Sequence, residues 1–395
     1  MKATVVGQGY VGLPLAITAS RFGYTIYGYD NNDEKIALLK SGKSIIEDFT
    51  DEVVKKSVDS KHYLPTIDQS VISDSEIILI CVPTPLSKDH KPDLEALISA
   101  TTTVGEYLKE GTLVIVESTI SPGTCRNILL PILLKESGLK LDDFNLAYSP
   151  ERIDPTNKNW GIGNTPKLVA GLTENAAKRA VEFYGKFIDS ITICSSLEIA
   201  ETAKLLENAF RLVNISFINE LAIFCQKIGI DISEVISAAA TKPYGFMPFY
   251  PSLGAGGHCI PVDPIYLANA AKAVGAPSRF IELADQINQE MPGYFVGRAE
   301  EKLGSLKAKK VLVVGVSYKP NIADVRESPV EGLITGLRQK NAHVSWHDDL
   351  VKEWNGEKSV ALSDKYDLAI LATPHDYLDL TKLGDVPILK TRGSV

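Results

Sequence analysis

A glycine pattern near the amino terminus has the spacing of a dinucleotide-binding loop. Residues 7–12 read Gly-Gln-Gly-Tyr-Val-Gly, which fits G-x-G-x-x-G between a predicted strand and a predicted amphipathic helix at Val11–Phe22. The first glycine permits a tight turn, the second lets the backbone approach a pyrophosphate, and the third allows close helix packing. The start of the helix supplies amide donors and the positive end of a dipole. The pattern predicts a cofactor site at Gly7, Gly9, Tyr10, Val11 and Gly12.

An acidic residue at the end of the second predicted strand favours NAD as the cofactor. Asp30 follows Gly7 by 23 residues, where a carboxylate is expected to bind the adenosine ribose. Its charge would repel the 2′-phosphate of NADP. Lys35 could neutralise nearby charge, and a solvated lysine is the alternative. For the pattern as a whole, the alternative is a glycine loop that binds no cofactor.

A cysteine in a glycine-rich loop is the candidate nucleophile. Residues 254–264 contain three glycines, then Cys259, and Asp263 four residues later. Gly256 and Gly257 would let the backbone approach a ligand closely. A thiolate adds readily to an aldehyde, and the adjacent His258 could favour the thiolate, although neighbouring side chains often point apart. A cysteine that fills the core is the alternative, and it is our interpretation of Cys81, Cys125, Cys194 and Cys225.

Basic and amide side chains recur in two further places. Lys204, Asn208 and Arg211 follow one another at spacings of four and three, so they share one face of a helix. A lysine and an amide on one face could stabilise an oxyanion, and a solvated polar face is the alternative. Lys319 and Arg326 suit a phosphorylated ligand, and ordinary surface charge is the alternative.

The first half of the chain alternates strand and helix patterns. This alternation predicts a parallel sheet covered by helices on both faces. The candidate strands are Ala3–Val6, Thr25–Tyr29, Ile77–Val82, Leu113–Glu117 and Leu168–Ala170.

A long helix begins near Leu197 and opens an all-helical stretch. Its apolar residues recur every three or four positions, which could form the seam of a dimer. They are Ile199, Ala203, Leu206, Phe210, Val213, Phe217 and Leu221. Further helical patterns cover Ile232–Ala240, Ile265–Ala273 and Pro277 to about Leu303. From Lys310 a strand and a single glycine repeat the start of the chain, followed by strand patterns at Ala342–Trp346 and Asp367–Ala372. The sequence thus predicts an α/β protein with two Rossmann-like, doubly wound domains joined by an all-α core.

Composition excludes several functional classes. A length of 395 residues indicates two or three domains. A net charge of −8 argues against nucleic acid as a partner, and no apolar run is long enough to span a membrane. Because Met1 leads straight into a strand pattern, we expect no signal peptide. The five cysteines form no Cys-x-x-Cys pair, so we expect reduced thiols, no metal site and a cytoplasmic protein.

Taken together, these motifs resemble the UDP-glucose/GDP-mannose dehydrogenase family over nearly the whole chain. The likeness rests on Gly7–Gly12, 81–85 (Cys-Val-Pro-Thr-Pro), 117–119 (Glu-Ser-Thr), 149–151 (Ser-Pro-Glu), Lys204–Glu220, Gly256–Asp263 and Tyr318–Pro329. It implies an NAD-binding domain at 1–196, a helical dimerisation domain at 197–300 and a UDP-sugar-binding domain at 301–395. It also implies a homodimer, or a multiple of one, that acts in polysaccharide biosynthesis.

The resemblance implies roles for individual residues. Cys259 would be the nucleophile, Lys204 and Asn208 would stabilise the C6 oxygen, and Asp263 would hold a water or act as a base. Glu151 and Thr119 would position and activate a hydrolytic water. Pro83, Thr84 and Thr119 would join the NAD site. The substrate would contact Glu151, Arg152, Lys204, Asn208, Arg211, Phe249, Tyr250, Gly256, Gly257, Lys319 and Arg326.

The motifs around the nucleophile distinguish branches of the family. The glucose-oxidising branch reads Gly-Gly-Ser-Cys-Phe-Pro-Lys-Asp, whereas residues 256–263 read Gly-Gly-His-Cys-Ile-Pro-Val-Asp. With 150–155 (Pro-Glu-Arg-Ile-Asp-Pro) and 244–251, these strings resemble enzymes that oxidise UDP-N-acetylhexosamines, especially UDP-N-acetylglucosamine. The glucose-oxidising branch has Pro-Glu-Phe followed by a later Glu-Gly, and this second glutamate is missing here. Residues 389–392 read Leu-Lys-Thr-Arg and depart from the family's usual Asp-Thr-Arg. UDP-glucose and UDP-N-acetylmannosamine remain alternative substrates, and the role of His258 stays open.

Other functional classes make different predictions. A nucleotide-sugar epimerase would retain its NAD, and the Tyr-x-x-x-Lys motif of short-chain enzymes is absent from the sequence. A hydroxyacid dehydrogenase needs no loop cysteine and makes one NADH per turnover. A sensor of NAD or UDP-sugar would bind without turnover.

Overall fold

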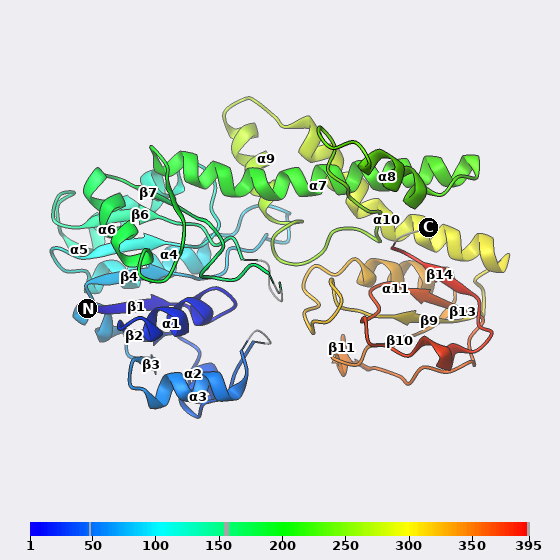
Figure 1. The fold of residues 1–395 in the computed structure, drawn as a ribbon, viewed down its shortest axis with the longest axis horizontal. Helices are drawn as coiled ribbons and strands as arrows, with labels where there is room; N and C mark the ends of the chain where they lie inside the picture. Colours follow the sequence, from blue (N-terminus) through cyan, green and yellow to red (C-terminus); the bar gives the residue numbers. More distant parts are fainter. Residues whose placement is uncertain (47–48, 154–156, 158, 393–395) are drawn as a thin grey trace. The chain divides into compact units, whose positions relative to one another are not determined.

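The computed structural model describes residues 1–46, 49–153, 157 and 159–392, in two compact units (Figure 1). The first unit is Met1–Leu206 and the second is Glu207–Val395. The division falls within the long helix α7 (Leu197–Ile228). None of the described helices is both long and apolar enough to cross a membrane.

The first unit contains an eight-stranded sheet in the order β3-β2-β1-β4-β5-β6-β7-β8. Its strands are β1 (Lys2–Val6), β2 (Thr25–Tyr29), β3 (Tyr63–Thr66), β4 (Ile77–Ile80), β5 (Leu113–Val116), β6 (Asn145–Tyr148), β7 (Lys167–Gly171) and β8 (Ile191–Ile193). All neighbours are parallel except β6 and β7, so the expectation of a wholly parallel sheet is wrong at this pair. The reason lies in the connection: no helix occurs among the described residues between β6 and β7, and a parallel pair would need a crossover.

Helices cover both faces of this sheet because successive strand residues point to opposite sides. In β4, Ile77 and Leu79 join the core under α1 and α6, whereas Ile78 and Ile80 join the core under α4 and α5. The helices are α1 (Gly12–Arg21), α2 (Asp33–Lys40), α3 (Asp51–Asp59), α4 (Glu95–Tyr107), α5 (Leu130–Ser137) and α6 (Glu174–Tyr184). Short turns of helix lie at Gln69–Asp74 and Cys125–Leu129.

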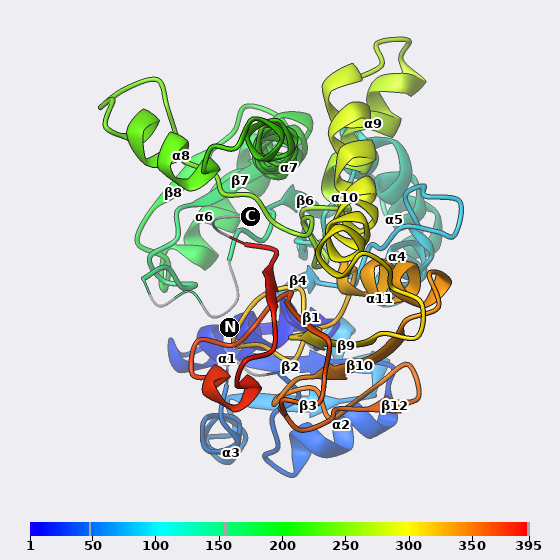
Figure 2. The same ribbon diagram turned by 90° about the vertical axis from the view of Figure 1, so that its right-hand side faces the viewer.

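The second unit joins a helical part to a smaller parallel sheet. Its helices are most of α7, then α8 (Ile232–Ala240), α9 (Asp263–Ala273), α10 (Arg279–Leu303) and α11 (Val330–Gln339). The sheet order is β10-β9-β13-β14, with β9 (Lys310–Val314), β10 (His343–His347), β13 (Leu368–Leu371) and β14 (Ile388–Lys390). A hairpin of β11 (Glu353–Trp354) and β12 (Glu357–Lys358) and a 3₁₀ turn at Leu380–Leu383 complete the unit. Gly336 of α11 lies against Val296 of α10, so the two helices pack closely (Figure 2).

The sequence located the strands β1, β2, β4, β5, β7, β9, β10 and β13 and the helices α1 and α7 to α10. The predicted strands and helices are confirmed with ends shifted by a few residues, and α8 has the predicted bounds. Strands β3, β6, β8, β11, β12 and β14 were not predicted. β3 contains Pro65, which disfavours strand formation, and β8 is mostly exposed, so neither shows a clear apolar pattern.

Candidate functional site

The glycine loop after β1 contains one glycine that the protein itself does not require. Gly7 has φ +92°, and an added Cβ would lie 2.7 Å from the carbonyl oxygen of Cys81. A Cβ on Gly12 would collide with the carbonyl of Gly7. In contrast, a Cβ on Gly9 would meet no atom within 4 Å, and its φ is outside the left-handed region. The loop therefore has open space at the position where a pyrophosphate would need a bare backbone, which fits a bound dinucleotide.

Asp30 lies directly after β2 and is almost buried. Its Oδ2 accepts hydrogen bonds from the Gln8 amide at 2.8 Å and from Lys35 Nζ at 2.7 Å, and its Oδ1 accepts from the Asn32 amide. Lys35 thus neutralises Asp30 rather than standing alone in solvent. The carboxylate is held in a fixed orientation beside the glycine loop.

The remaining predicted cofactor residues follow β4 and β5. β4 pairs in parallel with β1, and β5 pairs in parallel with β4, so the carboxyl ends of both strands share an edge with the glycine loop. Thr84 is buried, Pro83 is exposed and Thr119 is half-buried. Ser118 donates to the carbonyl of Val82 at 2.7 Å and ties the two segments together.

Glu151 follows β6 at the same edge of the sheet. Its Oε1 accepts the amide hydrogens of Arg152 and Ile153, each at 2.6 Å. Its Oε2 lies 3.9 Å from Nζ of Lys167, which the sequence analysis did not single out. The Arg152 guanidinium donates to the carbonyl of Pro166 at 2.6 Å. Asp154 and Pro155 of the same motif lie outside the described residues.

Lys167 belongs to a buried polar cluster. Its ammonium lies 2.7 Å from Glu117 Oε2 and 4.9 Å from the centre of the Tyr184 ring, and the Tyr184 hydroxyl donates to Glu117. Burial raises the pKa of Glu117 and also that of Tyr184. Burial opposes the charge of Lys167, but the attraction of Glu117 and then Glu151 outweighs it and raises the lysine pKa.

Helix α7 carries Lys204 and Asn208 one turn apart, and both side chains are buried, with 7% and 8% exposure. The alternative of a solvated polar face is therefore wrong for these two residues, whereas Arg211 is exposed. Asn208 Nδ2 donates to Asp263 Oδ2 at 2.6 Å. Asp263 opens α9 and is 2% exposed, so the amide holds a buried carboxylate in place.

The loop with Cys259 is built by close backbone packing within the second unit. The Cys259 side chain is exposed, and its carbonyl accepts the Asp263 amide hydrogen at 2.9 Å. A Cβ on Gly256 would lie 2.7 Å from the carbonyl oxygen of Glu327, and one on Gly257 would lie 2.7 Å from the Tyr318 ring. These two glycines therefore contact the 318–329 loop, a packing reason that the sequence did not reveal. One turn of backbone, closed by this hydrogen bond, thus joins the exposed Cys259 thiol to the buried Asp263 carboxylate.

Two asparagines fix the approach to this loop. Asn288 of α10 accepts the Ala255 amide hydrogen at 2.6 Å and donates to the Ala255 carbonyl at 3.1 Å. Asn219 of α7 accepts the Ser252 amide hydrogen at 2.8 Å. Both amides are buried, so the backbone before Cys259 is held by fixed partners.

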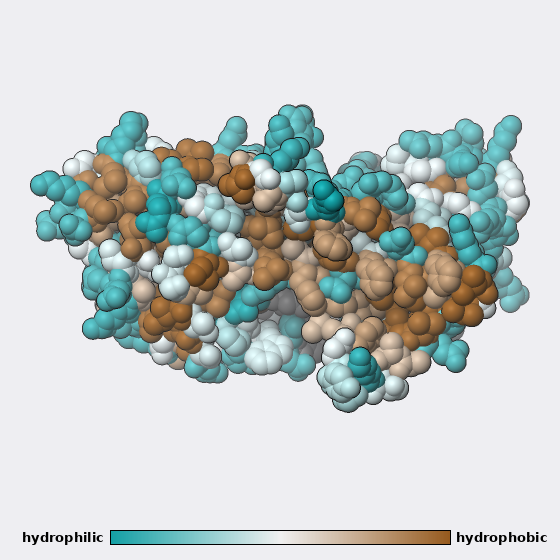
Figure 3. All heavy atoms as spheres, turned by 90° about the horizontal axis from the view of Figure 1, so that it is seen from above, coloured by the Kyte–Doolittle hydropathy of each residue, from teal (hydrophilic) through white to brown (hydrophobic). Residues whose placement is uncertain are grey.

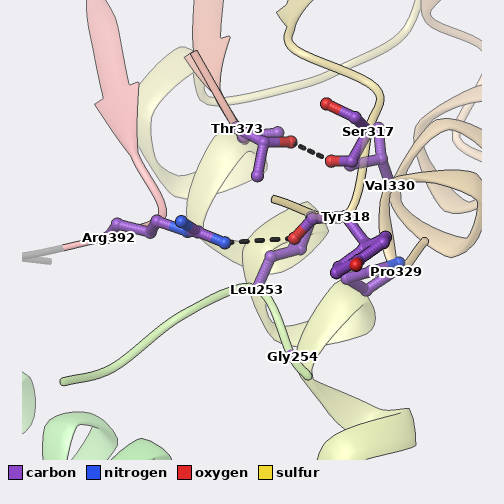
Figure 4. A pocket seen from close by; sticks show the side chains of 9 residues that line it. Leu253, Gly254, Ser317, Tyr318, Pro329, Val330, Thr373 and Arg392 are labelled. Carbon is purple, nitrogen blue, oxygen red and sulfur yellow. Dashed lines mark hydrogen bonds between the residues drawn. The ribbon is translucent and has the colours of Figure 1, made fainter. Parts of the chain in front are cut away.

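A small pocket opens at the carboxyl end of the second sheet (Figure 4). Tyr318 and Arg392 line it, and Arg392 Nη2 donates to the Tyr318 carbonyl at 3.2 Å (Figure 4). Arg392 follows β14, which the sequence analysis missed, so its place beside Tyr318 was not foreseen. The Arg326 guanidinium pairs with Asp324 through two nitrogens, at 2.9 and 2.5 Å. Lys319 is half-buried in the same loop.

The second sheet also repeats the aspartate of the first. Asp348 follows β10 and accepts the Val316 amide hydrogen at 3.0 Å, as Asp30 accepts that of Gln8. Its other oxygen, however, is 2.9 Å from His375 Nε2 and also accepts two backbone amides. Among the described residues, Asp348 therefore has four hydrogen-bond partners, one more than the three of Asp30.

Two predicted substrate residues lie in the segment between α8 and α9. Phe249 packs edge-on against Phe210 with ring centres 5.8 Å apart. Tyr250 is 55% exposed. Phe249 therefore has a packing role whether or not it also contacts a ligand.

Comparison with known proteins gives matches along the chain. Domains of the UDP-glucose/GDP-mannose dehydrogenase family match at residues 1–188 (NAD binding domain), 198–290 (central domain) and 312–391 (UDP binding domain). A UDP-N-acetyl-D-glucosamine 6-dehydrogenase of Pseudomonas aeruginosa is 36% identical, covering 95% of this chain and 90% of that protein. The solved UDP-D-ManNAc dehydrogenase of Pyrococcus horikoshii has a TM-score of 0.90 at 31% identity, covering 99% of this chain and 95% of that one. A UDP-glucose dehydrogenase of Pyrobaculum islandicum has a TM-score of 0.90 at 25% identity, covering 100% and 94%.

Proposed function

Because this chain belongs to the UDP-glucose/GDP-mannose dehydrogenase family of NAD-dependent UDP-sugar dehydrogenases, we propose that it oxidises C6 of a UDP-N-acetylhexosamine to a carboxylate. The observation that carries this proposal is the exposed Cys259 thiol, in a loop whose backbone is held by Asn288 and which leads into the buried Asp263. A two-electron dehydrogenase has no use for such a nucleophile.

The proposed reaction removes four electrons in two steps. The C6 alcohol loses a hydride and a proton and becomes an aldehyde. The Cys259 thiolate then adds to the aldehyde carbon while the oxygen takes up a proton, which gives a thiohemiacetal. Loss of a second hydride and proton gives a thioester. Water then breaks the C–S bond and releases the carboxylate, the thiol and a proton. NAD supplies the oxidation, since each of two molecules bound in turn accepts one hydride, and one sugar yields two NADH. Covalent capture keeps the aldehyde from diffusing away.

In the first unit, the proposed roles concern NAD and water. The glycine loop and Asp30 bind NAD, with Pro83, Thr84 and Thr119 beside them at the carboxyl edge of the sheet. Thr119 and Glu151 position the hydrolytic water, and Glu151 accepts its proton. The carboxylate of Glu151 suits this role because one oxygen is already fixed by two backbone amides.

On α7 and in the second unit, the proposed roles concern the sugar. Lys204 and Asn208 stabilise the C6 oxygen as charge develops, and both are buried, where donors act more strongly than in water. Asp263, fixed by Asn208, holds a water or acts as the base. Lys319, Arg326 and Arg392 supply positive charge for the diphosphate of UDP. Arg326 would have to share its guanidinium with Asp324.

The proposed substrate is UDP-N-acetylglucosamine. The motif at 256–263 and the name of the P. aeruginosa relative favour it, while the P. horikoshii structure bears the name of the manno epimer. We also propose the division into an NAD domain (1–196), a dimerisation domain (197–300) and a UDP-sugar domain (301–395). Cytoplasmic location and a place in polysaccharide biosynthesis stay predictions.

We propose a homodimer on the strength of the outer face of α7. Six large apolar side chains on this helix are 46–60% exposed, at successive spacings of 7, 4, 7, 7 and 4. These spacings keep them on one narrow stripe. They are Ile199, Leu206, Phe210, Phe217, Phe224 and Ile228. Figure 3 looks from above onto the side where α7 is drawn, and hydrophobic residues, coloured brown, also gather on that side. A stripe of this kind is typical of a helix that packs against a second copy.

One assay tests the proposal directly. The purified protein is given limiting amounts of UDP-N-acetylglucosamine, UDP-N-acetylmannosamine, UDP-glucose and GDP-mannose with excess NAD⁺. We expect the highest kcat/KM with UDP-N-acetylglucosamine and a plateau of two NADH per sugar. One NADH per sugar would refute the four-electron reaction, and a higher kcat/KM with UDP-glucose would refute only the choice of sugar.

A further inference from the structure

A buried lysine in the first unit is not explained by the roles assigned so far. Lys167 is the first residue of β7, with 6% exposure, and its ammonium pairs at 2.7 Å with Glu117, whose side chain is fully buried. Tyr184 donates to the same carboxylate and places its ring 4.9 Å from the ammonium. Such a pair contributes little stability for its desolvation cost, because apolar residues of similar size often serve as well.

The ammonium also faces the segment that carries Glu151. Lys167 Nζ lies 3.4 Å from the Pro150 carbonyl oxygen and 3.9 Å from Oε2 of Glu151. The other oxygen, Oε1, is held by the amides of Arg152 and Ile153. The two oxygens of Glu151 therefore have separate partners: the loop fixes one, and the lysine attracts the other.

The position of Lys167 follows from the sheet. It can face the residues after β6 because β7 runs antiparallel to β6, which brings the start of β7 toward the chain leaving β6. Glu117 and Tyr184 prevent the long lysine side chain from turning to solvent. The cluster thus has one cation between two carboxylates, of which Glu117 is fully enclosed and Glu151 is 19% exposed.

We propose that Lys167 is a positioning residue that holds the Glu151 carboxylate for activation of the hydrolytic water. This inference rests on the proposed function, in which Glu151 accepts the proton of the water that cleaves the thioester. Lys167 does not touch the reacting atoms; it fixes the oxygen that the loop amides leave unheld. Hydrolysis is therefore the step that depends on Lys167, whereas the two oxidation steps do not depend on it.

The test compares hydrolysis with folding. Lys167→Met removes the ammonium at similar length but leaves Glu117 buried without its counter-ion, so this variant is expected to be less stable. The pair Lys167→Met with Glu117→Gln removes both charges and should restore stability. Each is mixed rapidly with excess NAD⁺ and UDP-N-acetylglucosamine, while NADH is followed by absorbance and the protein by intact mass spectrometry. Lys178→Met, an exposed lysine on α6, is the matched control.

We expect the double variant to unfold like the wild type, release a burst of two NADH per active site, and then turn over 10- to 100-fold more slowly. Its main species should carry the sugar as a thioester on Cys259. Glu151→Gln should accumulate the same adduct, and Lys178→Met should not. If Glu151→Gln forms no adduct, the proposed role of Glu151 fails and this inference fails with it. If Glu151→Gln forms the adduct but the double variant turns over normally, Lys167 merely balances Glu117, and the inference alone is overturned.

Discussion

Replacing Gly9 by alanine tests whether glycine is needed at this position for folding or for binding of the cofactor. The added methyl group would meet no protein atom within 4 Å, and the φ of Gly9 lies outside the left-handed region that disfavours alanine. The unfolded chain loses conformational freedom, so stability should be unchanged or rise by about 0.5 kcal/mol. The matched change Gly7→Ala places a residue with a side chain at φ +92°, 2.7 Å from the carbonyl oxygen of Cys81. That variant should lose about 3 kcal/mol or more, from backbone strain and overpacking together.

Although Gly9→Ala should not reduce stability, it should weaken the binding of NAD. If the pyrophosphate approaches the backbone at Gly9, the methyl group overpacks that contact at a cost of about 1–3 kcal/mol. This corresponds to roughly a 5- to 150-fold weaker Kd for NAD. UDP binding should stay at the wild-type value, since the second unit is untouched. Calorimetric titration with NAD and with UDP, alongside denaturant unfolding, measures both quantities. Wild-type NAD affinity in Gly9→Ala would refute the assignment of the loop, and a loss of stability above 2 kcal/mol would refute the open space beside it.

Four further predictions concern chemistry, cofactor choice, pH and assembly. Cys259→Ser should fold and bind NAD and UDP but lose about 10³-fold or more of overall oxidation, about 4 kcal/mol of barrier; near wild-type oxidation of the 6-aldehyde would show that water adds directly. NADP⁺ should support turnover far less efficiently than NAD⁺ because of Asp30, and equal kcat/KM values would contradict that role. A hydrogen bond from Arg126 lowers the pKa of Glu198 to about 2. The pair therefore stabilises the fold at pH values above the pKa of Glu198 in the unfolded chain. This contribution is lost as the pH falls from about 5 toward 2. Because both groups are partly exposed, the loss should be only about 1 kcal/mol, and it should be absent in Arg126→Ala when unfolding is followed against pH. Phe217→Asp should convert the active dimer to monomer in sedimentation; a wild-type protein that is active as a monomer would show that the stripe on α7 is not an interface.

Much of the fold could be predicted from the sequence because its causes are local. The glycine spacing at 7–12 reflects steric demands within one turn, and two of those three demands are visible in the structure as contacts that a side chain would break. Apolar periodicity located α7 because every third or fourth residue faces one way whatever packs there. The same reasoning missed β14, and with it the place of Arg392, because a three-residue strand has too few positions to show a pattern.

The site's internal partners were decided by tertiary structure alone. Asn208 and Asp263 are 55 residues apart, and Lys167 and Glu117 are 50 apart, so no spacing rule connects them. The lysine reaches Glu151 only because β7 reverses direction against β6, a choice that depends on the connection between them. Likewise, Gly256 and Gly257 suggest a ligand when met in the sequence, but folding brings the Tyr318 loop against them. A sequence names the groups that can react; which of them face each other is set by the order and direction of strands, since these fix the distances over which charges and hydrogen bonds act.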